Sequence, residues 1–256
     1  MARARARGGT VVTTRVEFFD RIRAEMRTAR ALFPATPMER PARPAETVEI
    51  VRRELSERWP ATLERFRVEF ERVGGVLHRA QTLADVPALI GGIARERGFE
   101  RLVGWPPASL GADLERLLSA EGLAVEIMPA GEVSESARGD LRPRIARADL
   151  GLTGVDLAIA ETGTLVLRSG PGRPRSTSLL PPCHVALFER SALLESLQQF
   201  GVFLEAWHGD GEGSGGAMIN LITGPSRTAD IELTLTRGVH GPKEVHAIFV
   251  EAGLRV

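Results

Sequence analysis

The chain has 256 residues, 43% of them hydrophobic, and its 33 basic and 33 acidic side chains give a formal net charge of zero. This length supports a substantial hydrophobic core, and the charge balance gives no electrostatic reason to expect nucleic acid as a partner. No apolar run approaches the ~20 residues that a membrane helix needs, and the arginine-rich start lacks the apolar segment of a signal peptide. We therefore expect a cytoplasmic protein that binds neither nucleic acid nor membrane.

Cysteine and glycine patterns limit the cofactor chemistry of the chain. Cys183 is the only cysteine, which excludes an internal disulfide, a cysteine-based zinc site and an iron–sulfur cluster held by four cysteines of this chain. Cys183 begins an apolar run, so a small buried side chain is favoured over a nucleophile. The glycines of 209–216 do not follow the dinucleotide-binding spacing. We expect no metal site and no cofactor bound by this chain.

The first 73 residues are expected to form a disordered arm and a helical extension. Residues 1–14 are too short and too polar to pack on their own. Apolar spacing predicts one helix over 15–32 and a second over 47–73. The second helix is expected to be interrupted near Pro60, because proline inside a helix lacks a backbone donor.

Residues 74–256 are predicted to form one α/β domain. Short apolar runs alternate there with amphipathic segments of helix length, which indicates βα units and a mostly parallel sheet with flanking helices. Predicted strands cover 75–77, 101–103, 124–127, 183–188, 217–223 and 245–251. Predicted helices cover 85–97, 110–120, 191–200 and 228–236. Two further strands, 155–160 and 164–167, are expected to form a hairpin.

The turn of this hairpin, Glu161-Thr162-Gly163, presents a carboxylate and a hydroxyl group at a strand end. Glu161 can serve as a nucleophile, a general base or an acceptor for a substrate hydroxyl. The alternative is a turn carboxylate that caps neighbouring amides. We predict ligand contacts from Thr162, Gly163 and Thr164.

A second polar turn, Gly224-Pro225-Ser226, follows a predicted strand, and Arg227 is expected to open a helix whose free N–H groups face the turn. Arg227 can clamp a carboxylate or phosphate, and the alternative is an N-cap serine with a salt bridge within the segment. Because open α/β folds bind ligands at strand ends, we expect Glu161 and Arg227 to line one cleft at the carboxyl ends of the sheet. Further ligand contacts are predicted from Gly224, Ser226 and Thr228.

Arginine and histidine residues add candidates to this cleft. Arg168 is a predicted ligand contact, and Arg173 and Arg175 follow it in a Gly/Pro-rich loop. The three form either a cationic lip or an exposed loop with solvated side chains. His240, between glycines on a loop, is the second candidate acid–base residue, whereas His184 lies within a predicted strand and is expected to be a core histidine.

Four blocks in order along the chain resemble a known family: LTGVDLAIAETGTL at 152–165, LLPPCH at 179–184, TGPSRTADIE at 223–232 and GVHGP at 238–242. They are similar to the lactate-utilisation (LUD) domain family. The resemblance implies a fold like that of the ribose-5-phosphate isomerase, glucosamine-phosphate deaminase and CoA-transferase group. It also implies a role in bacterial oxidation of L-lactate to pyruvate alongside iron–sulfur partner proteins.

Three functions remain open at this point. The first is an accessory, non-redox subunit that binds a small carboxylate or phosphate. In the CoA-transferase branch of the implied fold group a strand-end glutamate is the nucleophile, so the second is a stand-alone enzyme acting through Glu161 on a CoA ester or sugar phosphate. The third is a metabolite-sensing or scaffold module with an interface at Phe18, Phe19 and Trp59. Each is compatible with a homo-oligomer.

Overall fold

The computed structural model describes residues 14–32, 41–209, 218–228 and 236–254, and the chain divides into two units. The first unit, Met1–Arg40, contains helix α1 (Arg15–Leu32), which confirms the helix predicted there. Most of the predicted disordered arm lies outside the described residues. No helix in the described ranges is long and apolar enough to cross a membrane.

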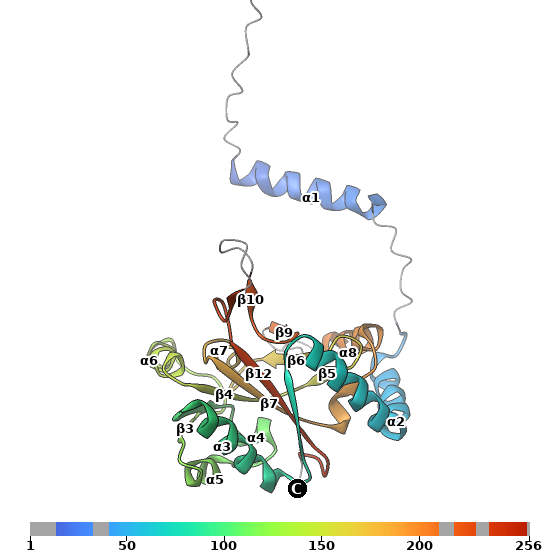
Figure 1. Cartoon of the computed structure of the whole chain (residues 1–256). Coiled ribbons are helices and arrows are strands. Elements are labelled where there is room, and N and C mark those ends of the chain that lie inside the picture. Colours follow the sequence, from blue (N-terminus) through green and yellow to red (C-terminus); the bar gives the residue numbers. More distant parts are fainter. Residues whose placement is uncertain (1–13, 33–40, 210–217, 229–235, 255–256) are drawn as a thin grey trace, which may run out of the picture. The chain divides into compact units, whose positions relative to one another are not determined.

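The second unit, Pro41–Val256, is built on a six-stranded parallel sheet with the order β1-β12-β7-β4-β2-β3 (Figure 1). Every neighbouring pair in this sheet is parallel. The strands are β1 (Val76–Ala80), β2 (Arg101–Gly104), β3 (Ala124–Ile127), β4 (Leu150–Gly154), β7 (Cys183–Glu189) and β12 (Glu244–Val250). The predicted α/β class with a mostly parallel sheet is thereby confirmed.

A smaller sheet with the order β8-β5-β6-β9 lies in the same unit. Its strands are β5 (Leu157–Ile159), β6 (Thr164–Ser169), β8 (Leu193–Leu194) and β9 (Met218–Ile222). β5 and β6 are antiparallel and form the predicted hairpin. A separate antiparallel ribbon joins β10 (Arg227–Thr228) to β11 (Thr236–Arg237).

Helices connect and cover these strands. They are α2 (Pro44–Arg72), α3 (Val86–Arg97), α4 (Pro107–Leu110), α5 (Glu115–Ala120), α6 (Glu135–Ala146), α7 (Ser176–Leu179) and α8 (Leu197–Gly209), with short 3-10 turns at Leu83–Asp85 and Arg190–Ala192. The helix predicted over 191–200 is wrong in its first half, because the buried residues Leu193 and Leu194 pair with β5. The helix predicted over 228–236 is wrong at both ends, which are strands, and 229–235 lies outside the described residues.

α2 and α3 pack on opposite faces of the parallel sheet. Successive side chains of a strand point to opposite faces, so Phe249 and Glu244 of β12 face different layers. Phe249 stacks on Trp59 of α2 with ring centroids 5.4 Å apart. Glu244 accepts a hydrogen bond from Arg97 of α3. The parallel sheet is therefore enclosed between helical layers.

The apolar side of α2 is part of the core of the second unit. Leu63, Phe66 and Phe70 belong to the main core cluster, and Val48 and Leu55 pack with the small sheet and α8. The helix runs continuously through Pro60, contrary to the predicted interruption. Burial of these side chains offsets the ~3 kcal/mol that an internal proline costs. The predicted boundary after residue 73 thus differs from the division at Arg40 that the contacts define.

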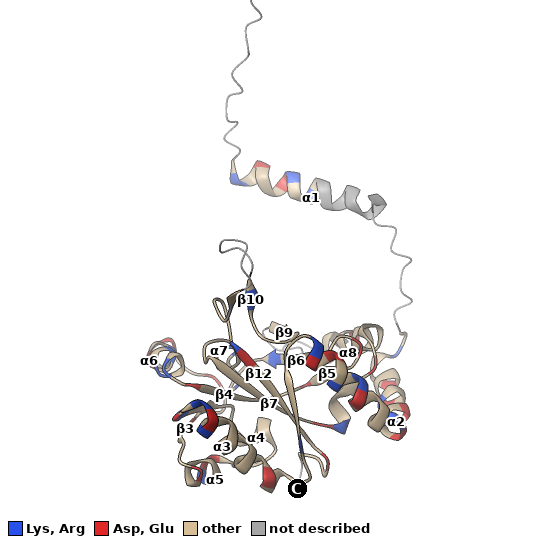
Figure 2. Ribbon diagram, viewed as in Figure 1, with Lys and Arg blue, Asp and Glu red and all other residues tan. Residues whose placement is uncertain are grey.

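The solvent-facing side of α2 carries both signs of charge. Arg67 contacts Glu64 and Glu71, one turn away in either direction, at 2.5 and 2.6 Å. Arg52 contacts Glu49 in the same way at 3.1 Å. Figure 2 shows acidic and basic residues interspersed along the helix. Such exposed pairs add little stability because water screens them, so the buried side of α2 determines its position.

Phe66→Ala tests the role of α2 in the core. The Phe66 side chain is 0% exposed, and its ring packs on Phe70 and Phe188. We expect the substitution to lower the free energy of unfolding by about 3–5 kcal/mol, the usual cost of removing a buried phenyl ring. Ile50→Ala on the same helix is the control, since Ile50 is 52% exposed and its loss should cost less than about 0.5 kcal/mol. Urea unfolding followed by circular dichroism measures the free energy of unfolding of both variants. Equally small losses in the two variants would show that the Phe66 ring does not pack in the core.

A buried polar pair lies inside the sheet next to this core. Oγ1 of Thr153 on β4 and Nε2 of His184 on β7 are 2.8 Å apart, and both residues are 0% exposed. His184 is therefore the core histidine that the sequence predicts. Burial lowers the pKa of His184 to about 3, and repulsion from His246 adds to the shift. The imidazole is held in its neutral form.

His184→Gln tests this buried imidazole through pH. Below the ordinary pKa of 6.5, the unfolded state takes up a proton that the folded state excludes until the pH approaches 3. Stability is therefore lost as the pH falls through this window, by up to about 1.4 kcal/mol per pH unit from this group. Urea unfolding from pH 7 to pH 5 should show a steeper loss for the wild type than for the variant. If the free energies of unfolding of the wild type and the variant fell equally with pH, a buried neutral imidazole at residue 184 would be ruled out.

Candidate functional site

The two predicted polar turns meet at one end of the small sheet. Ile159 pairs with Thr164, and Ile222 pairs with Leu165, so the ends of β5 and β9 flank the start of β6. A chain of hydroxyl groups joins the two turns, with Oγ1 of Thr164 2.7 Å from that of Thr162 and 2.8 Å from that of Thr223. The two segments therefore lie together, whereas the cleft expected between Glu161 and Arg227 stays a prediction. They lie at the small sheet, however, and not at the carboxyl ends of the parallel sheet.

The glycines of these turns give room to the backbone of α2. Gly163 has a φ of +60°, and a Cβ there would lie 2.6 Å from the Cα of Phe70. Gly224 has a φ of +79°, and a Cβ there would lie 2.5 Å from the carbonyl oxygen of Val73. Both glycines are predicted ligand contacts. In the structure the last turn of α2 occupies the space beside them.

Arg227 also contacts the end of α2. It starts strand β10 and does not open a helix, so the predicted helix N-terminus at this position is wrong. Its guanidinium donates a hydrogen bond to the carbonyl of Val73, the C-cap residue that directly follows α2. The last carbonyls of a helix have no partner within the helix, and a basic side chain satisfies one of them. Arg227 thereby fixes the end of α2.

Glu161 contacts a different helix. Its side chain is exposed, and Oε2 accepts a hydrogen bond of 2.9 Å from the backbone N–H of Leu197, the first residue of α8. A carboxylate at this place satisfies a free N–H group and interacts favourably with the helix dipole. The geometry therefore matches the capping alternative for Glu161. A nucleophilic or basic role stays a prediction.

The remaining predicted site residues surround Ser226. The backbone N–H of Ser226 donates to the carbonyl of Pro242 at 2.9 Å, and that of Gly238 donates to the carbonyl of Ser226 at 3.0 Å. These bonds bring the two C-terminal sequence blocks together. His240, within the second of these blocks, is exposed, and Thr228 lies half-buried in β10. Their catalytic and ligand-binding roles stay predictions.

A second group of polar residues lies where the chain direction in the parallel sheet reverses. From β2 the chain continues to β3 on one side, and from β4 it continues to β7 on the other, while β2 and β4 are neighbours. The carboxyl ends of such a strand pair form the usual ligand site of open α/β sheets. Trp105 follows β2 there, and Asp156 follows β4 by two residues.

Asp156 is the centre of this group. Its carboxylate accepts bonds from the backbone N–H of Arg168 at 2.7 Å and from Nε of Arg168 at 2.9 Å. Nη1 of Arg173 lies 3.3 Å from the same carboxylate. The Asp156 side chain is 10% exposed, and those of Arg168 and Arg173 are 21% and 27% exposed. Two guanidinium groups therefore share one buried carboxylate.

Two tryptophans lie against these guanidinium groups. The Cζ atom of Arg168 is 4.3 Å from the ring centroid of Trp207 on α8, and that of Arg173 is 5.7 Å from the centroid of Trp105. Nε1 of Trp105 donates to the carbonyl of Pro174 at 3.2 Å, which holds the arginine loop over β2. Cation–π contact keeps an arginine in place without neutralising its charge. We call Asp156, Arg168, Arg173, Trp105 and Trp207 the arginine cluster.

The arginine cluster can hold an anion. A half-buried guanidinium binds a carboxylate or phosphate with two parallel hydrogen bonds. Arg168 is predicted to lie with Glu161, but these residues lie at opposite ends of the hairpin. Asp156 has no predicted role, although a carboxylate beside an apolar run indicates a buried partner. Arg175, the third predicted lip residue, donates instead to Sδ of Met218 at 3.0 Å.

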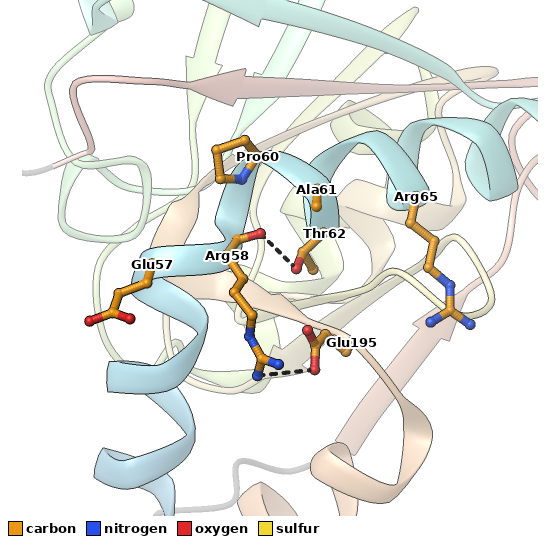
Figure 3. A pocket seen from close by; sticks show the side chains of 7 residues that line it. All are labelled: Glu57, Arg58, Pro60, Ala61, Thr62, Arg65 and Glu195. Atoms are coloured by element: carbon orange, nitrogen blue, oxygen red, sulfur yellow. Dashed lines mark hydrogen bonds and ion pairs between the residues drawn. The ribbon is translucent and has the colours of Figure 1, made fainter.

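A shallow hollow of about 450 Å³ lies beside the middle of α2 (Figure 3). It is lined by Glu57, Arg58, Pro60, Ala61, Thr62, Arg65 and Glu195. Arg58 and Glu195 face each other across it and form an ion pair at 3.5 Å. Its two facing charges already neutralise each other. The hollow is therefore a weaker candidate for anion binding than the arginine cluster.

The chain is similar to known proteins of one family. Residues 63–250 match the model of the LUD domain family. The chain is 41% identical over 121 residues to "Lactate utilization protein C" of Halalkalibacterium halodurans, covering 47% of this chain and 52% of that protein. A protein of the same name from Exiguobacterium sp. is 43% identical over 104 residues, covering 41% and 45%. The chain thus spans about half the length of these curated relatives.

The crystal structure of a DUF162 family protein from Deinococcus radiodurans is also similar to this chain. It superposes with a TM-score of 0.47 at 20% sequence identity. The superposition covers 75% of this chain and 98% of that one.

Gly163→Ala tests whether the polar turn holds the end of α2. The added Cβ would meet the backbone of Phe70, which cannot move aside as a flexible side chain would. Gly98→Ala is the matched control, since Gly98 has a similar φ of +68° and nothing within 4 Å of an added Cβ. The control should lose about 1–2 kcal/mol of stability from left-handed strain alone. We expect Gly163→Ala to lose about 1–3 kcal/mol more from overpacking. Similar losses in urea unfolding would show that α2 does not need this contact.

Proposed function

Because the chain belongs to the LUD domain family, we propose that it works in lactate utilisation as a subunit that binds a small carboxylate and carries no redox centre of its own. The names of the relatives that it matches over about half their length support this role. In this proposal iron–sulfur partner proteins in the cytoplasm carry the electrons of L-lactate oxidation. The contribution of this chain is to bind and orient the organic acid.

The arginine cluster is the observation that carries this proposal. Nη1 of Arg173 lies 3.3 Å from Asp156 and the Arg173 side chain is 27% exposed, so this guanidinium can bind an anion at the same place. Organic acids of the lactate and pyruvate class carry one carboxylate, which a guanidinium group binds with two parallel hydrogen bonds. Partial burial strengthens the attraction, because water screens it less than on an open surface.

Arg173 is the main ligand contact in this proposal. Its Nη1 faces Asp156, and the guanidinium has further donors on Nε and Nη2 that can bind a carboxylate. Trp105 lies against the same guanidinium and limits its rotation. A positioned arginine loses less conformational entropy when it binds a ligand. The proposal places no chemistry on Glu161, which caps α8.

Arg173→Gln tests the proposal by measuring the affinity for L-lactate and pyruvate. Tryptophan fluorescence reports binding, because Trp105 and Trp207 belong to the cluster, and calorimetry provides an independent measurement. Loss of a charged hydrogen bond costs about 1.5–3 kcal/mol, so the Kd should rise by about ten- to one-hundred-fold. Arg175→Gln, in the same loop, should leave the Kd within about twofold. Equal affinities of the wild type and Arg173→Gln would overturn the site.

Growth on L-lactate tests the physiological part of the proposal. Deleting the gene should abolish growth on L-lactate, and the wild-type gene should restore it better than Arg173→Gln. Normal growth of the deletion strain would contradict the role in lactate utilisation. A flavin or iron–sulfur cluster in the purified protein would contradict the non-redox role.

A further inference from the structure

Three side chains with metal-binding atoms meet at the amino ends of β7 and β12. Cys183 and Glu244 are paired in register, and His246 points to the same side as Glu244 two residues later. Cys183 Sγ, a carboxylate oxygen of Glu244 and a ring nitrogen of His246 all lie within 4.8 Å of one another. Cys183 and His246 are 0% and 2% exposed, whereas Glu244 is partly exposed.

Two neighbouring residues hold this group in place. Nε2 of His78 on β1 lies 2.9 Å from Nδ1 of His246, and Nε2 of His246 lies 3.2 Å from Oε2 of Glu244. A bond to one ring nitrogen fixes which nitrogen of an imidazole is available for a metal ion. Arg97 of α3 donates to Oε2 of Glu244 and orients its carboxylate. The ligand atoms are thus positioned by a second layer of hydrogen bonds.

Contrary to the expected absence of a metal site, a single cysteine does not exclude a mixed site, and we propose that Cys183, Glu244 and His246 bind a divalent ion of the zinc class. A thiolate, an imidazole and a carboxylate are the ligand types that zinc takes in proteins. Tetrahedral bonds of the usual lengths place sulfur and nitrogen ligands about 3.5 Å apart, so a small rotation of the Cys183 and Glu244 side chains closes the site. A water molecule takes the fourth ligand position and reaches it from solvent past the partly exposed side chain of Glu244.

A divalent ion displaces the thiol proton of Cys183 and attracts both the resulting thiolate and the carboxylate of Glu244. Arg97 pairs with the same carboxylate, so the centre together with Arg97 carries one positive charge. The site joins β7 to β12 and, through His78, to β1. It lies at the amino ends of the parallel strands, whereas the arginine cluster lies at carboxyl ends. The bound ion therefore acts as a structural link, independent of anion binding.

Cobalt absorption tests the site on the intact chain. Co²⁺ adopts the same coordination as zinc, and a thiolate ligand gives an intense near-ultraviolet charge-transfer band. Cys183 is the only cysteine of the chain, so this band in the chelator-treated wild type identifies its sulfur as a ligand. We expect the band to saturate at one Co²⁺ per chain and to disappear when Zn²⁺ is added. No band at stoichiometric Co²⁺ would overturn the proposal.

Three variants separate the ligands from their surroundings. Cys183→Ser should remove the band and the increase in Tm that Zn²⁺ gives the wild type, because an ion that binds only the folded state stabilises it. His78→Gln should retain the band but weaken Zn²⁺ binding by about 10- to 100-fold, as expected for a positioning residue. His208→Asn, an exposed histidine on α8, should behave like the wild type. Unchanged Zn²⁺ affinity in Cys183→Ser, or loss of binding in His208→Asn, would contradict the site.

Discussion

The burial of α2 against both sheets is the constraint on which the rest of the second unit depends. Phe66 and Phe70 stack on each other and place the end of the helix beside Phe188 of the parallel sheet. The hairpin turn approaches the same end closely enough that only glycine fits at residue 163. Hydrophobic burial supplies the driving force, and the glycine contacts and the Arg227 bond to Val73 set the position of the helix end.

This constraint explains why the most distinctive sequence motifs are not the most favourable anion site. Two polar turns rich in glycine and hydroxyl groups suggest a ligand that approaches the backbone. In this fold a helix of the same chain makes that approach, and Glu161 and Arg227 cap α8 and α2, respectively. One carboxylate oxygen of Glu161 and one nitrogen of the Arg227 guanidinium have partners within the protein. The half-buried guanidinium of Arg173 lies at the other end of the hairpin, in the arginine cluster.

The two ends of the parallel sheet have different chemistry. At the carboxyl ends, the reversal of chain direction between β2 and β4 makes room for the arginine loop, and Asp156 anchors it. At the amino ends, the register of β7 and β12 brings a thiol and a carboxylate together under α3. A rigid sheet keeps the two places apart, so an anion and a metal ion can bind without competing.

The sequence by itself determined the α/β class, because alternation between strand-type and helix-type runs is a local property. The strands β2, β3, β7 and β12, the β5–β6 hairpin and the core position of His184 follow from such runs. Amphipathic spacing also shows that α2 buries one face, but it does not show against which partner. Only the tertiary structure decided that α2 belongs to the core, that Arg227 caps it, and that Asp156 pairs with two arginines. It also brought Cys183 to Glu244 and His246, because strand order and register join residues that are far apart in the chain and share no local pattern.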